Sequence, residues 1–253
     1  MRATRWFRGV AGFREFMLLV VIVFACIGMS FASDVFASKA NILATLLNIS
    51  TESIVAIGMT LLMVAGGFDL SVGANVALCG AATALGLVHG WPPALAIPFG
   101  LGLGACVGLV NGLIIAYIGI NPFITTLGMM SILRGLLLVT THGTNITGLP
   151  ESFKYIGQGK VLGVQWPIVL SVALLVAGDI LLRKWRFFRQ SYYIGGNERA
   201  ALLSGIPVKR ITLFNYALAG LLAALAGIVM TARLGAASVT AGTGLELKVI
   251  SAV

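Results

Sequence analysis

The chain has 253 residues, of which 58% are hydrophobic and 10% are charged, and its mean hydropathy is +1.01. Because a soluble domain carries about 25% charged residues, this composition excludes an ordinary soluble globule and predicts an α-helical protein that crosses a bilayer several times. The formal net charge is +9. Since the charges stand between apolar runs, they indicate topology setting and anchoring on an anionic inner leaflet, not nucleic-acid binding.

The first apolar segment covers residues 16–33 and follows four arginines, Arg2, Arg5, Arg8 and Arg14. A membrane-spanning helix needs about 20 mostly apolar residues, so we expect a span that starts from a cytoplasmic N-terminus. A signal peptide with Phe31-Ala32-Ser33 as its cleavage site has a similar beginning and stays an alternative. In both cases the next residues lie outside the cytoplasm.

Six further apolar segments follow, at about 45–66, 72–88, 93–119, 123–141, 167–182 and 211–230, and another begins near Leu247. Counting from a cytoplasmic N-terminus, the chain returns to the cytoplasm near residue 183 and the loop over 141–166 lies outside. The largest basic cluster stands at this return, and the positive-inside rule places such a cluster in the cytoplasm. It consists of Arg183, Lys184, Arg186, Arg189, Arg199, Lys209 and Arg210.

These patterns predict an all-α, polytopic transmembrane helical bundle of about seven to eight spans. We expect it to form a single domain over residues 1–253.

The second and third segments are separated by residues 66–73, which include Asp69 and Ser71. A carboxylate inside the hydrocarbon would be costly and would indicate function. The interpretation that the sequence favours is structural: two glycines break one helix, and Asp69 or Ser71 caps the next near the membrane surface. A break at membrane depth would still be suited to shape a pathway. We therefore take Asp69, Ser71, Asn111 and Thr125 as candidate pathway residues, with packing as the competing role for Asn111.

The fourth segment carries four glycines at a spacing of four residues, Gly100, Gly104, Gly108 and Gly112. Residues at this spacing line one helical face, and glycine there lets another backbone approach closely. The seventh segment has a similar row of small residues, Gly220, Ala224 and Gly227. We expect these faces to pack helices into a compact bundle.

Helix signals mark a short segment within residues 195–209. Asn197 is a favourable N-cap, Glu198 suits the positive helix start, Gly205 fits the C′ position and Pro207 stops the helix. The predicted helix has about seven residues, and isolated helices shorter than about 12–15 residues are marginal in water. We therefore expect a surface to stabilise it; an ordinary helical loop resting on its own bundle is the alternative.

The sequence contains no phosphate-binding loop: Gly159-Lys160 is followed by Val161, and Lys154 stands where the first glycine should be. We read no nucleophile–base pair and no metal-ligand cluster in it. No catalytic residue, metal or cofactor is therefore expected, and the chain is not expected to hydrolyse ATP by itself.

Several motifs occur in a characteristic order: AIGMT at 56–60, GGFDLSVG at 66–73, Asn111-Gly112, PFITTLG at 122–128, Arg134-Gly135, the segment 195–209 and AGTGLEL at 241–247. In these motifs the chain resembles the permease subunits of bacterial ABC importers for monosaccharides, the family of the ribose, xylose, arabinose and autoinducer-2 systems. The resemblance covers nearly the whole chain from about Asn41 onward.

The resemblance implies a subunit that translocates a monosaccharide or similar small polar solute. Its implied partners are separate ABC ATPase subunits, a periplasmic or extracellular solute-binding protein and a second permease subunit, identical or different. It also implies that residues 195–209 form the cytoplasmic coupling element that docks on the ATPase. The residues that we expect to serve this docking are Gly196, Asn197, Glu198, Ala200, Ala201 and Gly205.

Members of the resembled family continue with further membrane segments, so we expect this chain, which stops at Val253, to be C-terminally incomplete. An ion-coupled secondary transporter is the main alternative and would use Asp69 as its coupling carboxylate. A non-transporting membrane scaffold, left by truncation, is the other.

Overall fold

The computed structural model describes the backbone of residues 3–161 and 163–253 and the side chains of 16–161 and 163–253. The chain divides into two compact units, Met1–Leu46 and Leu47–Val253. The expected all-α fold is confirmed, with one small addition: a two-stranded antiparallel hairpin, β1 (Lys160–Val161) and β2 (Val164–Gln165), which the sequence did not predict.

The first unit consists of helix α1 (Ala3–Ala32), a turn and the start of α2 (Lys39–Val64). Asn41 fixes the turn, because its Nδ2 donates to the Phe36 carbonyl at 2.8 Å and its backbone N–H donates to Ser38 Oγ at 3.3 Å. Over residues 16–32, whose side chains the structure describes, most apolar side chains of α1 are exposed, as in Phe24 at 71%. A helix with this surface is suited to a lipid environment.

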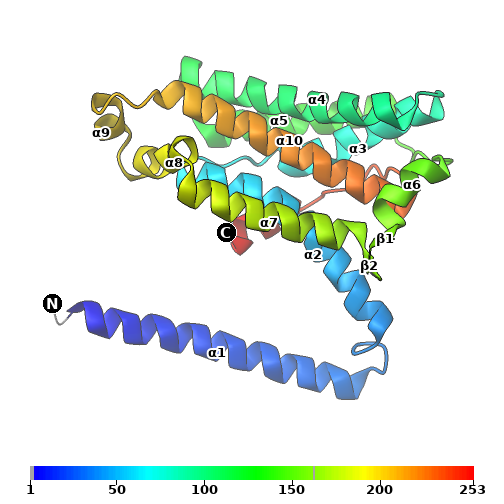
Figure 1. Ribbon diagram of the computed structural model, residues 1–253, viewed down its shortest axis with the longest axis horizontal. Helices are drawn as coiled ribbons and strands as arrows, with labels where there is room; N and C mark the ends of the chain where they lie inside the picture. Colours follow the sequence, from blue (N-terminus) through cyan, green and yellow to red (C-terminus); the bar gives the residue numbers. More distant parts are fainter. Residues whose placement is uncertain (1–2, 162) are drawn as a thin grey trace. The chain divides into compact units, whose positions relative to one another are not determined.

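The second unit contains the rest of α2 and nine further helices (Figure 1). The long ones are α3 (Val72–Val88), α4 (Pro93–Leu113) with a π-helical continuation η1 (Ile114–Ile118), α5 (Pro122–Thr141), α7 (Trp166–Lys184) and α10 (Val208–Leu234). The short ones are α6 (Glu151–Gln158), α8 (Arg186–Gly196), α9 (Glu198–Leu203) and α11 (Leu245–Ala252).

Among the described residues, five helices are long and apolar enough to cross a membrane: α2, the α4–η1 helix over Pro93–Ile118, α5, α7 and α10. Two shorter apolar helices, Phe16–Ala32 and Val72–Val88, correspond to the first and third segments expected from the sequence. The chain is therefore a multi-pass membrane protein.

Small residues pack α4 against α10, as the spacing of their glycines predicted. A Cβ atom on Gly104 would lie 2.6 Å from the Gly220 carbonyl oxygen, and one on Gly220 would overlap the Gly104 carbonyl oxygen. Gly227 lies as closely against the backbone of Val76 on α3. Since every larger residue would push the backbones apart, these glycines set the helix spacing at the centre of the bundle.

Helix α10 carries a short helix at each end (Figure 1). At its C-terminal end α6 is packed so closely that a Cβ on Gly157 would overlap the backbone of Arg233, and Gln158 Nε2 donates to the Arg233 carbonyl at 3.0 Å. At its N-terminal end α8 and α9 share a small core of Ile194, Ala201, Val208 and Ile211. The region over 141–166, expected only as a loop, thus contains a docked helix as well as the hairpin.

Candidate functional site

The continuous helical path from α2 to α3 is broken over residues 65–71. The break follows from the glycines: Gly66 has a φ of +82°, and Gly67 approaches the Tyr216 hydroxyl so closely that a Cβ would lie 2.9 Å from it. Tyr216 in turn donates from its hydroxyl to the Phe68 carbonyl at 3.0 Å. The break is therefore held against α10 at the level of Tyr216.

Tyr216 is the ninth residue of the 27-residue α10, which begins at Val208. At a rise of about 1.5 Å per residue, it lies about 12 Å from the start of a helix about 40 Å long. The break is thus well inside the length of a membrane-spanning helix. Irregular backbone at such depth occurs where it is buried in protein or lines a cavity.

A buried polar cluster occupies this break and consists of Asp69, Ser71 and Asn111, with 1%, 0% and 0% of their surfaces exposed. Asp69 Oδ1 accepts from the backbone N–H of Ser71 at 2.7 Å and from its hydroxyl at 2.6 Å. Asn111 Nδ2, from α4, donates to Asp69 Oδ2 at 3.3 Å and to Ser71 Oγ at 3.0 Å. The cluster therefore ties the break to α4.

This geometry gives Asp69 and Ser71, which the sequence suggested as helix caps, bonds beyond the start of α3. Ser71 is the N-cap of α3, but its side chain makes no capping bond. Asp69 does bond to the backbone at the helix start, yet it is buried and joined to a residue 42 positions away. A carboxylate that is buried in this way is costly unless it is hydrogen-bonded, and Asp69 accepts three hydrogen bonds, two from Ser71 and one from Asn111.

Thr125, the fourth candidate pathway residue, lies on α5 and is 8% exposed. Its hydroxyl and the Asn111 Oδ1 atom are buried, and neither has a hydrogen-bond partner among the described residues. The structure thus joins Asp69, Ser71 and Asn111 by hydrogen bonds, whereas Thr125 is buried without a bond to them.

The caps predicted for the short helix within residues 195–209 are confirmed in α9. Asn197 Oδ1 accepts from the Ala200 N–H at 3.0 Å, and Gly205 has the positive φ, +80°, of a C′ residue. Ser204 Oγ adds a bond to the Ala200 carbonyl at 2.8 Å. The helix runs over six residues, Glu198–Leu203, close to the seven expected.

Exposure separates the candidate docking residues into two groups. Gly196, Asn197, Glu198, Ala200 and Gly205 are exposed, but Ala201 is 4% exposed and packs into the core beneath α9. Ala201 therefore positions the helix and does not offer a surface to a partner. The sequence analysis did not single out Leu202 and Leu203, which are 63% and 89% exposed. The signal that could have found them is a pair of adjacent leucines at the end of a short helix that begins with Glu198 and Arg199.

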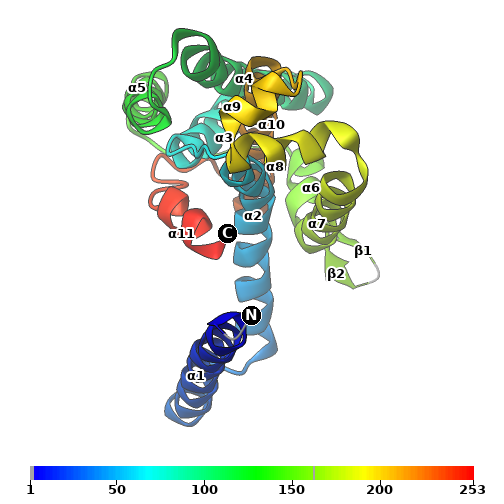
Figure 2. The same ribbon diagram turned by 90° about the vertical axis from the view of Figure 1, so that its left-hand side faces the viewer.

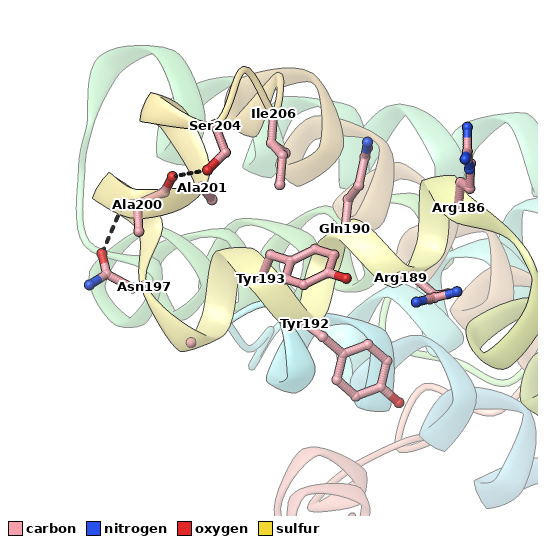
Figure 3. A pocket seen from close by; sticks show the side chains of 11 residues that line it. Arg186, Arg189, Gln190, Tyr192, Tyr193, Asn197, Ala200, Ala201, Ser204 and Ile206 are labelled. Atoms are coloured by element: carbon pink, nitrogen blue, oxygen red, sulfur yellow. Dashed lines mark hydrogen bonds between the residues drawn. The ribbon is translucent and has the colours of Figure 1, made fainter.

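A groove of about 810 Å³ lies between α8 and α9. Figure 3 shows Tyr193, Gln190 and Ile206 along it, with Arg186 and Arg189 from α8 nearby. The salt bridges formed by the described residues include neither of these arginines. The groove therefore combines aromatic surface with positive charge that has no carboxylate partner in this part of the chain.

Backbone contact connects the α8–α9 segment to the break. Gly195, near the end of α8, is so close to the last residue of α2 that a Cβ atom would overlap the Val64 carbonyl oxygen. A cavity of about 480 Å³ adjoins this contact, and Gly67, Glu198, Leu202 and Tyr216 are among its lining residues. One cavity thus borders the short helix α9, the break after α2 and Tyr216 of α10.

Among the described residues, no group of three or more His, Cys, Asp or Glu side chains could hold a metal ion. α8, which precedes α9 in the chain, meets the end of α2 at Gly195, and α2 leads directly into the polar break.

A family model described as "Branched-chain amino acid transport system / permease component" matches residues 41–253. The chain belongs to this family of transport-system permease components. It is therefore a transport subunit and not an enzyme.

Individual relatives agree with this assignment. The chain is 44% identical over 243 residues to the ribose import permease protein of Bacillus subtilis (strain 168), covering 95% of this chain and 74% of the relative. It is 35% identical over 237 residues to the D-allose transport system permease protein of Escherichia coli (strain K12), covering 93% and 72%. It is 34% identical over 236 residues to the L-arabinose ABC transporter permease protein of Azospirillum brasilense, covering 93% and 69%. No solved structure matches the chain.

Proposed function

We propose that this chain is the membrane-spanning permease subunit of an ATP-binding-cassette importer, and that it translocates a monosaccharide or a similar small polar solute. Relatives named for ribose, allose and arabinose support the solute class. The observation that carries the mechanism is the contact of Gly195 with the end of α2, because it gives a docked cytoplasmic helix direct access to a polar break inside the membrane.

The proposed topology places the N-terminus, α8 and α9 in the cytoplasm and α6 with its hairpin outside. It counts the five long helices together with α1 and α3 as seven spans, with α11 as an eighth segment. The basic residues near α8 and α9 support this orientation, since cytoplasmic loops carry an excess of Lys and Arg. The membrane is the bacterial inner membrane.

The proposed assembly has two permease subunits, identical or different, two ATPase subunits inside and one solute-binding protein outside. Exposed Leu202 and Leu203, with Asn197, Glu198 and Ala200, form the surface for the ATPase. Apolar side chains that are exposed together on a surface indicate a site of protein interaction. Gly205 and Ala201 set the shape of this surface from beneath.

The proposed coupling step begins when ATP binding closes the ATPase pair and displaces α9. Because α8 meets α2 backbone to backbone at Gly195, the displacement moves the end of α2 and the break that follows it. The hydrogen bonds among Asp69, Ser71 and Asn111 then differ between the outward-open and inward-open states. Coupling requires this difference, since a partner shifts an equilibrium only by its differential affinity for the two states.

Uptake of radiolabelled ribose, arabinose and allose by proteoliposomes tests the function. The liposomes would contain the permease and its ATPase, with ATP inside and the binding protein outside. We expect uptake that needs both ATP and the binding protein and is insensitive to an uncoupler. Uptake that survives loss of ATP and collapses with an uncoupler would instead identify an ion-coupled transporter with Asp69 as its coupling carboxylate.

A further inference from the structure

A polar cavity lies at the end of α10 opposite to α9, and nothing in the proposed coupling mechanism uses it. Its volume is about 420 Å³, within the range of about 300–1,000 Å³ that is usual for small-molecule sites. Residues of α2, the end of α10, the loop over 235–244 and α11 line it; Figure 2 shows α11 beside α2. The polar side chains that matter here are Asn48, Glu52, Arg233, Thr240, Thr243 and Lys248.

Two pairs of interacting side chains lie in the lining of this cavity. Arg233 Nη2 donates to Asn48 Oδ1 at 2.9 Å, and Lys248 Nζ lies 3.3 Å from Glu52 Oε1. In each pair one group has no hydrogen-bond partner among the described residues. These groups are the side-chain N–H₂ of Asn48 and the Oε2 atom of Glu52. These are one donor and one acceptor of the kind that bind hydroxyl groups in pairs.

The loop over 235–244, which carries Thr240 and Thr243, is fixed by contacts with α5 and with the segment after it. Arg134, from α5, donates to the Ala241 carbonyl at 2.9 Å, and Asn145 Oδ1 accepts from the Val239 N–H at 3.1 Å. A short antiparallel bridge between Ile146 and Ala237 anchors the start of the same loop. Thr240 and Thr243 are therefore presented from a fixed backbone, which lowers the entropic cost of binding.

Charge and surface chemistry select the class of ligand. Two cations, Arg233 and Lys248, face one carboxylate, Glu52, so the lining carries a net charge of +1 and disfavours cations. Lys248 is paired with Glu52, and Arg233 uses Nη2 towards Asn48, so neither is an unpaired cation that would select an anion. Arg233 keeps further N–H donors that can bind a ligand hydroxyl group. Met230 and Leu245 add apolar surface, against which the C–H faces of a sugar ring can pack.

We propose that this cavity is an external reception site for an uncharged polyhydroxylated solute, with Asn48, Glu52 and Arg233 as its principal hydrogen-bonding residues. The inference rests on the proposed function, which supplies the external orientation and the monosaccharide class. The Glu52–Lys248 pair is partly exposed, 37% and 66%, so it is weak and opens readily when a hydroxyl group replaces the lysine.

The test measures binding to the purified permease in lipid nanodiscs without binding protein or ATPase. The probes are D-ribose, L-arabinose and D-allose, followed by saturation-transfer NMR, with ribose 5-phosphate as an anionic comparison. We expect saturable binding of at least one neutral sugar. Glu52→Gln should weaken it about tenfold, or about 1.4 kcal/mol, and Ser238→Trp, which fills the cavity, should abolish it.

Glu151→Gln is the matched control, because Glu151 is an exposed carboxylate at the same end of the bundle, paired with Lys154 at 2.8 Å and outside the cavity. It should leave sugar binding unchanged. Binding that is absent in the wild type, equal in Glu52→Gln and Glu151→Gln, or restricted to the sugar phosphate would overturn the proposal. Loss of the binding protein from Ser238→Trp with sugar binding intact would assign the cavity to protein docking instead.

Proteoliposome uptake separates this inference from the proposed function. Failure of the wild-type assembly to import any of the three sugars would contradict the function. ATP-dependent uptake that proceeds at the normal rate in both Glu52→Gln and Ser238→Trp would contradict only the reception site.

Discussion

The two short helices at the ends of α10 differ in how much of their surface the chain itself covers. α6 buries Phe153 completely and presses Gly157 onto the α10 backbone. α9 buries only Ala201 and leaves Leu202 and Leu203 in the open. We interpret α6, which is fastened by a buried side chain and by backbone packing, as a structural closure. The two exposed leucines of α9 fit the surface that we propose for the ATPase.

The largest expected effect concerns the stability of the end of α10 that α6 covers. Gly157→Val places a side chain where the Arg233 backbone lies, so we expect a loss of about 3 kcal/mol of unfolding free energy, measured by denaturant titration in detergent. Gly196→Val at the α9 end is the matched control, since a Cβ there meets nothing within 4 Å. It should cost less than about 0.5 kcal/mol. Equal losses at the two ends would refute the distinction.

At the α9 end, a substitution should lower the affinity for the ATPase and leave the stability of the permease unchanged. Leu203→Ser removes the most exposed side chain of α9, and we expect its affinity for the ATPase to fall about 30-fold, or about 2 kcal/mol. Thermal unfolding of the isolated permease should not change. Tyr155→Ala, which trims an exposed side chain of α6, should leave ATPase recovery intact. The docking assignment fails if pull-down of the ATPase is the same for Leu203→Ser and wild type.

A smaller effect is expected from the α9 cap. Asn197→Ala removes the bond to the Ala200 N–H, which should cost about 1 kcal/mol and weaken ATPase binding about fivefold. Asn197→Asp keeps an oxygen at the cap and should restore the affinity. Backbone hydrogen exchange over residues 198–203 would report the loosening directly. If alanine and aspartate behave alike, the cap does not shape the docking surface.

The smallest effect concerns the surface of α6. Lys154→Met removes a pair with Glu151 whose carboxylate is 86% exposed. An exposed pair of this kind contributes less than about 1 kcal/mol, so stability and ATPase binding should both stay near the wild-type values. A large loss by denaturant titration would mean that α6 is held by charge and not by its close backbone packing.

Local signals sufficed for much of this fold. The apolar segment expected at 93–119 corresponds to the continuous helix Pro93–Ile118, and the predicted cap residues Asn197 and Gly205 both take up their roles. These features depend on neighbouring residues, so a single sequence contains them. The glycine row of α4 was informative for the same reason, because its spacing defines one helical face.

The rest depends on contacts between distant residues. Asp69 and Asn111 are 42 positions apart, and nothing local to Asp69 distinguishes a surface cap from a bond to another helix. α6 is an eight-residue helix whose binding partner, Arg233, follows 75 positions after Gln158. The six residues of α9 are too few for periodicity to tell buried Ala201 from exposed Leu202.

In the proposed coupling, the contact between Gly195 and Val64 determines how much of a displacement of α8 reaches α2. Side chains that meet at an interface can change rotamer and absorb a displacement of an ångström or so. Here two backbones meet with no side chain between them, so no rotamer is available to take up the movement. The contact should therefore transmit a displacement of α8 to α2 almost without loss. Gly195→Ala would push the end of α2 away from α8, although it removes no hydrogen bond.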